Sequence, residues 1–203
     1  ADSEDLRPFI MCEYAYAKSN SNGNFKEFWD YIYKFPRFQG GFLWDFADEA
    51  LHVDIKEDGC VNPSGKNKKY VYGGAFGEAV VDETPDMCMN GVVFPDLSFK
   101  PSAYEVRNGQ SPVTIELVKH PYFGTEQWQI VNRYHALDLS HLKIVWELIC
   151  NGEVADHGVL RTYTTPAGSQ EALDMPFDRS KVYGESYVNY YVQYKEDTFF
   201  AKA

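Results

Sequence analysis

Two continuous apolar runs, separated by a segment with helical periodicity, dominate the first 46 residues. The first run is PFIMC at 8–12 and the second is QGGFLWDF at 39–46. Runs of this kind are typical of strands that are buried on both faces. A strand, a helix and a strand within about forty residues form a βαβ unit, whose two strands are parallel neighbours. The first half of the chain is therefore predicted to be α/β.

The segment between the two runs has the pattern of an amphipathic helix. Asn24 is a candidate N-cap, and Glu27 follows three residues later, as in a capping box. Pro36 ends the predicted helix because proline cannot donate the next backbone hydrogen bond. The apolar residues that share one helical face are Phe25, Phe28, Trp29 and Ile32.

The character of the chain changes twice after these elements. Residues 50–100 are rich in Gly, Pro, Asn and Asp, which predicts loops, and 100–109 predicts one short helix that ends at Gly109. From Pro112 onward the apolar period becomes two, and we place a domain boundary near residue 110.

The second half has the pattern of short antiparallel strands. Asn151 and Gly152 form the strongest short hairpin signal in the chain, directly after an alternating run. Short strands with frequent turns favour a β-sandwich. The segments that we predict as strands are 128–134, 142–150, 158–163 and 187–194.

Composition excludes several classes of function. The formal net charge of -11 argues against partners that are themselves anionic, so we expect neither nucleic acid nor a membrane surface as a partner. No apolar stretch approaches the length of a transmembrane helix. The cysteines are scattered without a CxxC pair, so we expect free thiols and not a zinc site. They are Cys12, Cys60, Cys88 and Cys150.

Glu13 is the most suggestive polar residue, because it directly follows a predicted buried strand and precedes a polar loop. In a βα barrel the residues that perform chemistry lie at the carboxyl ends of strands. Trp44 has a similar position after the second run, where an indole can stack on a sugar ring. Asp45 and Asp48 are nearby carboxylates. From the residues alone, ordinary structural roles for all four stay open.

Four segments together resemble glycoside hydrolase family 2, and specifically its large β-galactosidases. They are RPFIMCEYAYAKSNSNGNFKEFWDYI, FPRFQGGFLWDFADEAL, YGGAFGE and MCMNGVVF, in the order and spacing of the family. The later segments YHALDLSHLKIVWELICNGEVADHGVL and YVNYYVQYKEDTFFAKA are similar to the sandwich domain that follows the barrel in those enzymes. The resemblance covers nearly the whole chain, and the EYA and QGGFxWDxxD motifs are its most specific part.

The resemblance implies a fold that is α/β followed by all-β. Residues 1–110 would supply the C-terminal portion of a (β/α)8 barrel, with strands 7 and 8. Residues 111–203 would form an immunoglobulin-like β-sandwich that is truncated at its C-terminus.

The resemblance also implies roles for individual residues. Glu13 would be the nucleophile of a retaining β-galactosidase and would form a covalent glycosyl-enzyme. Trp44 would pack against the galactose ring, and Asn90 would contact the 6-hydroxyl group and help to bind sodium. The backbone carbonyl of Met87 would be a second sodium ligand. Magnesium is also expected as a cofactor, with ligands outside these residues.

Two residues depart from the family pattern EYAHAMGNS. Tyr16 replaces a histidine that contacts the sugar, and Lys18 replaces a methionine. Nucleophilic chemistry is compatible with both changes. Tyr16, as a substrate-binding residue, leaves open a preference for another sugar, so β-glucuronidase and β-mannosidase are alternative activities.

The resemblance places the acid/base glutamate on an earlier barrel strand, outside these residues. A retaining glycosidase needs that second carboxyl group roughly 5–5.5 Å from the nucleophile. We therefore expect the 203 residues alone to be inactive, with the remainder of the parent enzyme, often an oligomer in this family, as the partner. The expected substrate is a β-galactoside or oligosaccharide. A non-catalytic scaffold or carbohydrate-binding sandwich at 112–203 is the alternative from another class.

Overall fold

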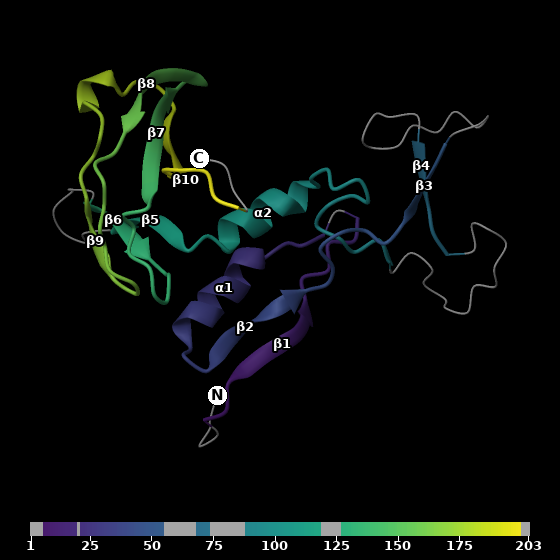
Figure 1. The fold of residues 1–203 in the computed structure, drawn as a ribbon. Helices are drawn as coiled ribbons and strands as arrows, with labels where there is room; N and C mark the ends of the chain where they lie inside the picture. The colour runs from purple at the N-terminus through teal and green to yellow at the C-terminus, as the bar shows by residue number, and fades with distance from the viewer. Residues whose placement is uncertain (1–5, 20, 55–67, 74–87, 119–126, 200–203) are drawn as a thin grey trace. The chain divides into compact units, whose positions relative to one another are not determined.

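The computed structural model describes residues 6–19, 21–54, 68–73, 88–118 and 127–199. The chain divides into two compact units, Ala1–Gln110 and Ser111–Ala203 (Figure 1). Strands and α-helices of the first unit precede a second unit that consists mainly of strands. No helix within the described ranges is long and apolar enough to cross a membrane.

The first unit begins with a βαβ arrangement. Strand β1 (Phe9–Tyr14) and strand β2 (Phe38–Leu43) pair in parallel, and helix α1 (Phe25–Lys34) connects them (Figure 1). The predicted parallel pairing of the two apolar runs is confirmed. Because parallel strands share one direction, their carboxyl ends meet at the same edge of the sheet.

The prediction that both strands are buried on both faces is wrong for this structure. Phe9 and Ile10 on β1 are 54% and 52% exposed, and Phe42 on β2 is 66% exposed. The physical reason is that this sheet contains two strands, and the packed side chains of α1 meet only the side that carries Tyr14 and Leu43. The apolar runs indicate a burial that these two strands and one helix do not provide.

Helix α1 has the predicted apolar face but not the predicted cap. Phe25 and Ile32 are buried. Asn24 has left-handed backbone angles (φ 58°, ψ 25°), and its side chain makes no capping hydrogen bond. The capping box with Glu27 is therefore absent, because a side-chain cap requires an extended backbone at the N-cap. The helix ends at Lys34, before Pro36.

The remainder of the first unit contains two further strands and a helix. Strands β3 (Leu51–Asp54) and β4 (Lys68–Val71) form an antiparallel pair within a segment whose composition predicts loops. Helix α2 (Pro101–Gly109) matches the predicted short helix. The core of this unit consists of Tyr14, Ala17, Phe25, Val92, Val93 and Val106.

The second unit consists of two three-stranded antiparallel sheets, ordered β10-β7-β8 and β5-β6-β9. A short 3₁₀ helix, η2 (Arg179–Lys181), precedes the last strand. The strands are β5 (Val113–Val118), β6 (Gln127–Asn132), β7 (Leu142–Cys150), β8 (Glu153–Val159), β9 (Gln170–Leu173) and β10 (Ser186–Tyr194).

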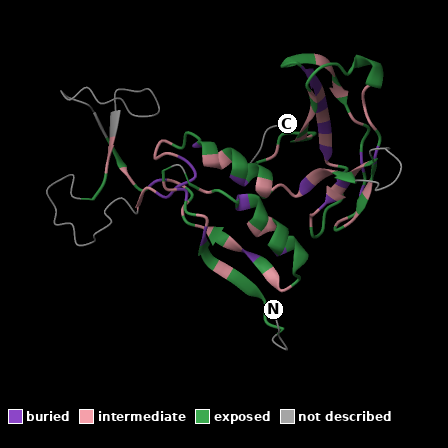
Figure 2. Ribbon diagram, turned by 180° about the vertical axis from the view of Figure 1, so that it is seen from behind, coloured by how far each residue is buried: buried purple, intermediate pink, exposed green. Residues whose placement is uncertain are grey.

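The two sheets share one apolar core, which is consistent with a β-sandwich. Ile130 of β6 and Ile144 of β7 belong to the same buried cluster, so side chains from both sheets meet. From Leu142 to Leu148 on β7, buried and half-buried positions alternate (Figure 2), as a strand with one face on the core requires, and the last three positions of β7 are all buried. Asn151 and Gly152 have positive φ angles of 51° and 84°, which confirms the predicted hairpin turn between β7 and β8.

One predicted strand, at 158–163, is confirmed only for its first two residues. Strand β8 ends at Val159, and residues 160–165 do not pair in a ladder. The cause is that Tyr163 and Thr165 are buried while their neighbours Thr162 and Pro166 are exposed. This alternation has a strand's period, but it arises from irregular backbone that covers the core.

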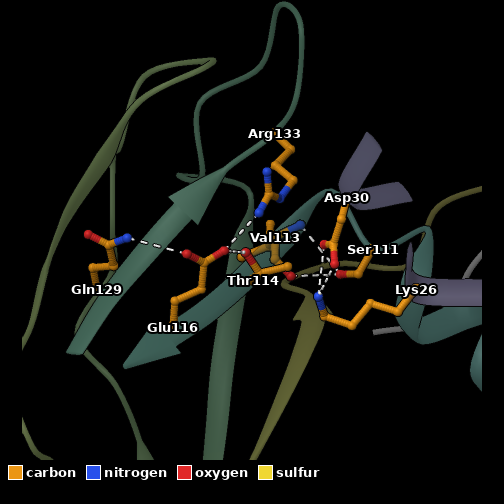
Figure 3. Close-up of polar contacts among 8 residues, drawn as sticks. All are labelled: Lys26, Asp30, Ser111, Val113, Thr114, Glu116, Gln129 and Arg133. Carbon is orange, nitrogen blue, oxygen red and sulfur yellow. Dashed lines mark hydrogen bonds and ion pairs between the residues drawn. The ribbon is translucent and has the colours of Figure 1, made fainter. Parts of the chain in front are cut away.

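Each unit also has its own polar grouping, and Figure 3 draws both. In α1, Lys26 and Asp30 form an ion pair of 2.6 Å one helical turn apart. In the second unit, Arg133 pairs with Glu116 at 2.7 Å. All four side chains are partly or largely exposed, so each pair contributes roughly 0–1 kcal/mol to stability.

Candidate active site

Three segments of the first unit meet where β1 and β2 end. They are residues 13–17, residues 44–48 and residues 88–93, and backbone hydrogen bonds connect all three. The Trp44 N–H donates to the Tyr14 carbonyl (3.3 Å), which links the first two segments. The Asn90 carbonyl accepts from the N–H groups of Ala17 (3.1 Å) and Asp45 (3.0 Å), which links the third segment to both others. The predicted site residues of these segments therefore share one edge of the sheet.

Glu13 is an exposed residue near the carboxyl end of β1. Its neighbour Tyr14 is buried, stacks on Phe25 at a ring distance of 5.8 Å, and accepts a hydrogen bond from Trp29 (3.2 Å). Tyr14 is therefore anchored in the core, while the adjacent Glu13 is exposed to solvent. Glu13 thus has a fixed backbone and a carboxylate that is accessible to solvent.

Tyr16 donates a hydrogen bond from its hydroxyl group to the Glu13 carboxylate. This contact raises the pKa of Tyr16, since the neighbouring carboxylate favours the protonated phenol. No motif in the sequence predicts it. In a regular strand, residues three apart lie on opposite faces, but β1 ends at Tyr14 and Ala15 has a left-handed backbone (φ 54°) between the two side chains.

Trp44 directly follows β2 and is 45% exposed. Its backbone is held on both sides, by the bond to Tyr14 and by the bond from Asp45 to Asn90. An indole that is half exposed at a strand end offers a flat apolar surface beside the Glu13 segment. This arrangement suits stacking against the apolar face of a sugar ring.

Asn90 is almost fully buried, with 1% of its surface exposed, and it is followed by Gly91. A Cβ atom at Gly91 would lie 2.1 Å from the backbone nitrogen of Asp48 and 2.2 Å from the Ala47 carbonyl carbon. Only glycine fits this close approach of two backbones. The asparagine–glycine pair is therefore a tightly packed crossing of two segments.

A buried ion pair lies where the two segments cross. Lys100 Nζ lies 2.6 Å from Asp48 Oδ1, and their side chains are 10% and 1% exposed. The same carboxylate oxygen accepts from the Gly91 N–H (2.8 Å), and Lys100 also donates to the Ala17 carbonyl (3.4 Å). Asp48 thus has a structural role as the ion-pair partner of Lys100. Sequence reasoning missed Lys100, because nothing in its local pattern indicates burial.

A hollow of about 400 Å³ adjoins this ion pair. Among the described residues, neither Glu13 nor Trp44 lines it. Its polar lining includes Lys18, Ser19, Ser21, Tyr72, Lys100 and Ser102. Lys18, one of the two departures from the family pattern, therefore lines this hollow.

The expected metal ligands are only partly within the described residues. Met87 lies outside them, as does most of the YGGAFGE segment. Asn90 lies within them, and its amide oxygen is the kind of hard donor that alkali and alkaline-earth cations prefer. The described part of the chain contains no cluster of three or more His, Cys, Asp or Glu side chains that could hold a metal ion.

The family models match both halves of the chain. Residues 2–115 match the model of "Glycosyl hydrolases family 2, TIM barrel domain". Residues 128–203 match the model of "Beta-galactosidase, domain 4". The two matches thus indicate a portion of a glycoside hydrolase TIM barrel domain followed by a β-rich domain. The chain belongs to glycosyl hydrolase family 2.

Curated relatives agree with this family. The chain is 35% identical over 176 residues to a protein named beta-galactosidase from Photobacterium profundum. The aligned residues are 86% of this chain and 16% of that protein. The chain is 36% identical over 167 residues to one from Klebsiella pneumoniae (82% and 15%) and 30% identical over 203 residues to one from Pseudoalteromonas haloplanktis (98% and 18%). The chain therefore spans less than a fifth of the length of these relatives.

Proposed function

We propose that these residues form the nucleophile-bearing portion of a retaining β-galactosidase. In this proposal β1 and β2 are strands 7 and 8 of a (β/α)8 barrel, and residues 111–203 are an immunoglobulin-like sandwich that follows it along the chain. The exposed apolar side chains of Phe9, Ile10 and Phe42 support the barrel assignment, because further strands would bury them.

The observation on which the proposal rests is the convergence at the strand ends. Three segments far apart in sequence place Glu13, Trp44 and Asn90 at one edge of a parallel sheet, through hydrogen bonds of 3.0–3.3 Å. That edge is where catalytic residues of βα barrels lie. A carboxylate can attack a sugar, a half-exposed indole can stack against its ring, and a buried amide can hydrogen-bond to it.

Each residue then has a defined role. The Glu13 carboxylate attacks the anomeric carbon, the bond to the leaving-group oxygen breaks, and a covalent glycosyl-enzyme forms. Water later attacks that carbon and releases Glu13 as a carboxylate. Trp44 stacks on the sugar ring, and Asn90 hydrogen-bonds to its 6-hydroxyl group.

Two cofactors belong to the proposal. Sodium would be held by the Asn90 amide oxygen and the Met87 carbonyl, and when bound it would help to orient the 6-hydroxyl group. Magnesium would bind through residues outside this chain. The proton donor would also come from outside it, so the 203 residues alone would not hydrolyse glycosides. General acid catalysis typically contributes roughly 10²–10⁴-fold.

The names of the relatives favour galactose over glucuronic acid or mannose, since each is called beta-galactosidase. The proposal therefore names terminal β-galactosides as substrates of the full-length protein. An oligomer of that protein is part of the proposal as well.

Azide rescue tests the role of Glu13. In the full-length protein, Glu13→Gly is expected to lose hydrolysis of nitrophenyl β-galactoside, and added azide should restore turnover by taking the place of the carboxylate. The product should be α-galactosyl azide, with inverted configuration. Glu105→Gln, an exposed carboxylate change on α2, is the matched control and should keep full activity.

The result can contradict the proposal in two ways. Retention of activity in Glu13→Gly would remove Glu13 from the mechanism. Activity of the unchanged protein on glucuronides or mannosides, without activity on galactosides, would replace the proposed substrate and leave the nucleophile in place.

A further inference from the structure

We propose that Tyr16 is a positioning residue for the Glu13 carboxylate: its phenol holds the nucleophile in one orientation. This inference depends on the proposed function of Glu13. It gives Tyr16 a different role from the sugar contact that the family resemblance implies for this position. The observation behind it is the hydrogen bond from the Tyr16 hydroxyl group to Glu13 Oε2.

The backbone is shaped to make this contact. Side chains alternate along a strand, so an extended chain would place residues 13 and 16 on opposite faces. Ala15 instead has a φ of 54°, a left-handed conformation that costs a non-glycine residue free energy. The alternation therefore stops here, and Tyr16 lies on the side of Glu13.

Both flanks of the turn are anchored. On one side, the Tyr14 carbonyl accepts from the Trp44 N–H at 3.3 Å. On the other side, the Ala17 N–H donates to the Asn90 carbonyl at 3.1 Å, and the Tyr16 carbonyl accepts from Ser21 Oγ at 2.8 Å. These bonds hold the backbone before and after Ala15. The backbone position from which the Tyr16 side chain extends toward Glu13 is therefore fixed.

The protonation states fit a donor role. The pKa of Tyr16 is raised above its ordinary value of 10.0, chiefly by the hydrogen bond to Glu13 and then by burial. The phenol therefore stays protonated, and able to donate, throughout the neutral range. A donor to a carboxylate favours its charged form, which is the form that attacks.

Within the described residues, the other titratable groups near this strand end include Cys12, Asp45, Asp48, Cys88 and Lys18. Cys12, on β1, acts electrostatically on Tyr16. Asp45 follows β2. Asp48 is paired with Lys100, while Cys88 borders the third segment and Lys18 lines the hollow.

The test is the pH profile of kcat/KM for a nitrophenyl β-galactoside, measured on the full-length protein and on Tyr16→Phe. Phenylalanine keeps the ring and removes only the donor. We expect kcat to fall about tenfold with little change in KM, and the acidic limb to move up by about half to one pH unit. The limb moves up because the carboxylate loses a donor to its charged form.

Two further variants separate positioning from packing. Tyr104→Phe, on the exposed face of α2, should change neither kcat nor the acidic limb. Tyr16→His, whose ring N–H can also donate, should restore part of the lost kcat. If Tyr16→Phe does not fold, 3-fluorotyrosine at position 16 keeps the ring and makes the phenol a stronger donor. The acidic limb should then move to lower pH.

The inference is overturned if the acidic limb stays in place while KM rises, because Tyr16 would then contact the sugar alone. An unchanged limb with 3-fluorotyrosine overturns it too. Failure of the proposed function has a different signature. In that case the unchanged protein would lack β-galactosidase activity, or Glu13→Gly would retain it.

Discussion

Replacing Lys100 by methionine tests whether the buried ion pair is what holds the site segments together. Methionine has a similar length and keeps most of the packing, but it removes the positive charge from Asp48. The side chains of Lys100 and Asp48 are 10% and 1% exposed, and their charged atoms lie 2.6 Å apart. The variant therefore leaves a carboxylate in an interior from which water is largely excluded.

The expected loss of stability in Lys100→Met follows from the burial of the ion pair and not from the distance between its charged atoms. Removing one partner of a buried pair typically costs about 3–5 kcal/mol, because the remaining charge is neither paired nor hydrated. The pair formed by Lys26 and Asp30 has the same 2.6 Å separation, but its side chains are 68% and 56% exposed. Lys26→Met should accordingly cost less than about 0.5 kcal/mol. The two substitutions are matched in chemistry and differ in solvent access.

Hydrogen–deuterium exchange on the full-length protein measures the loss of stability in the site segments themselves. Peptides that cover residues 44–48 and 88–93 report the free energy of local opening of the site segments. We expect faster exchange there in Lys100→Met and unchanged exchange in Lys26→Met. A double variant, Asp48→Asn with Lys100→Met, keeps an acceptor for the Gly91 N–H and should recover about half of the loss.

Equal exchange in Lys100→Met and Lys26→Met would refute this reasoning, because burial would then have no effect on the cost of breaking the pair. The same conclusion would follow if the double variant were less stable than Lys100→Met. In either case Asp48 would not be the structural carboxylate that its contacts indicate.

Two other predictions concern the third segment. Gly91→Ala places a Cβ atom 2.1 Å from a backbone nitrogen, so we expect a loss of at least about 1–3 kcal/mol in thermal or urea unfolding. Gly23→Ala, where nothing lies within 4 Å, should stay within about 1 kcal/mol of the original, and equal effects would contradict the packing argument. Exchanging sodium for choline at constant ionic strength should raise KM for a β-galactoside. Asn90→Ala should abolish that dependence, and an undiminished response in Asn90→Ala would remove Asn90 as a ligand.

The regular elements of the chain are largely predictable from periodicity. The apolar runs around Ile10 and Phe42 predict two parallel strands, and the alternation in 142–150 predicts β7 with its Asn151–Gly152 turn. These signals are strong because side-chain burial repeats with the period of the backbone. The same rule fails at Tyr163, where irregular backbone happens to bury alternate residues.

The candidate site is predictable as a set of residues but not as a geometry. Their positions at the ends of apolar runs are enough to indicate Glu13 and Trp44 as candidates. The contact between Tyr16 and Glu13 depends on one left-handed residue, Ala15, and no periodic pattern encodes it. The role of Lys100 depends on a partner 52 positions earlier in the chain. Contacts of this kind are set by tertiary structure, so local sequence patterns do not predict them.

Covalent trapping tests the central claim most directly. The full-length protein would be treated with 2-deoxy-2-fluoro-galactosyl fluoride, digested, and mapped by peptide mass spectrometry. We predict a single fluorogalactosyl adduct on Glu13, which would establish the nucleophile, the retaining mechanism and the acceptance of galactose together. An adduct on a different carboxylate would contradict the assignment of Glu13. Trapping only by a glucuronyl or mannosyl analogue would instead contradict the assignment of galactose.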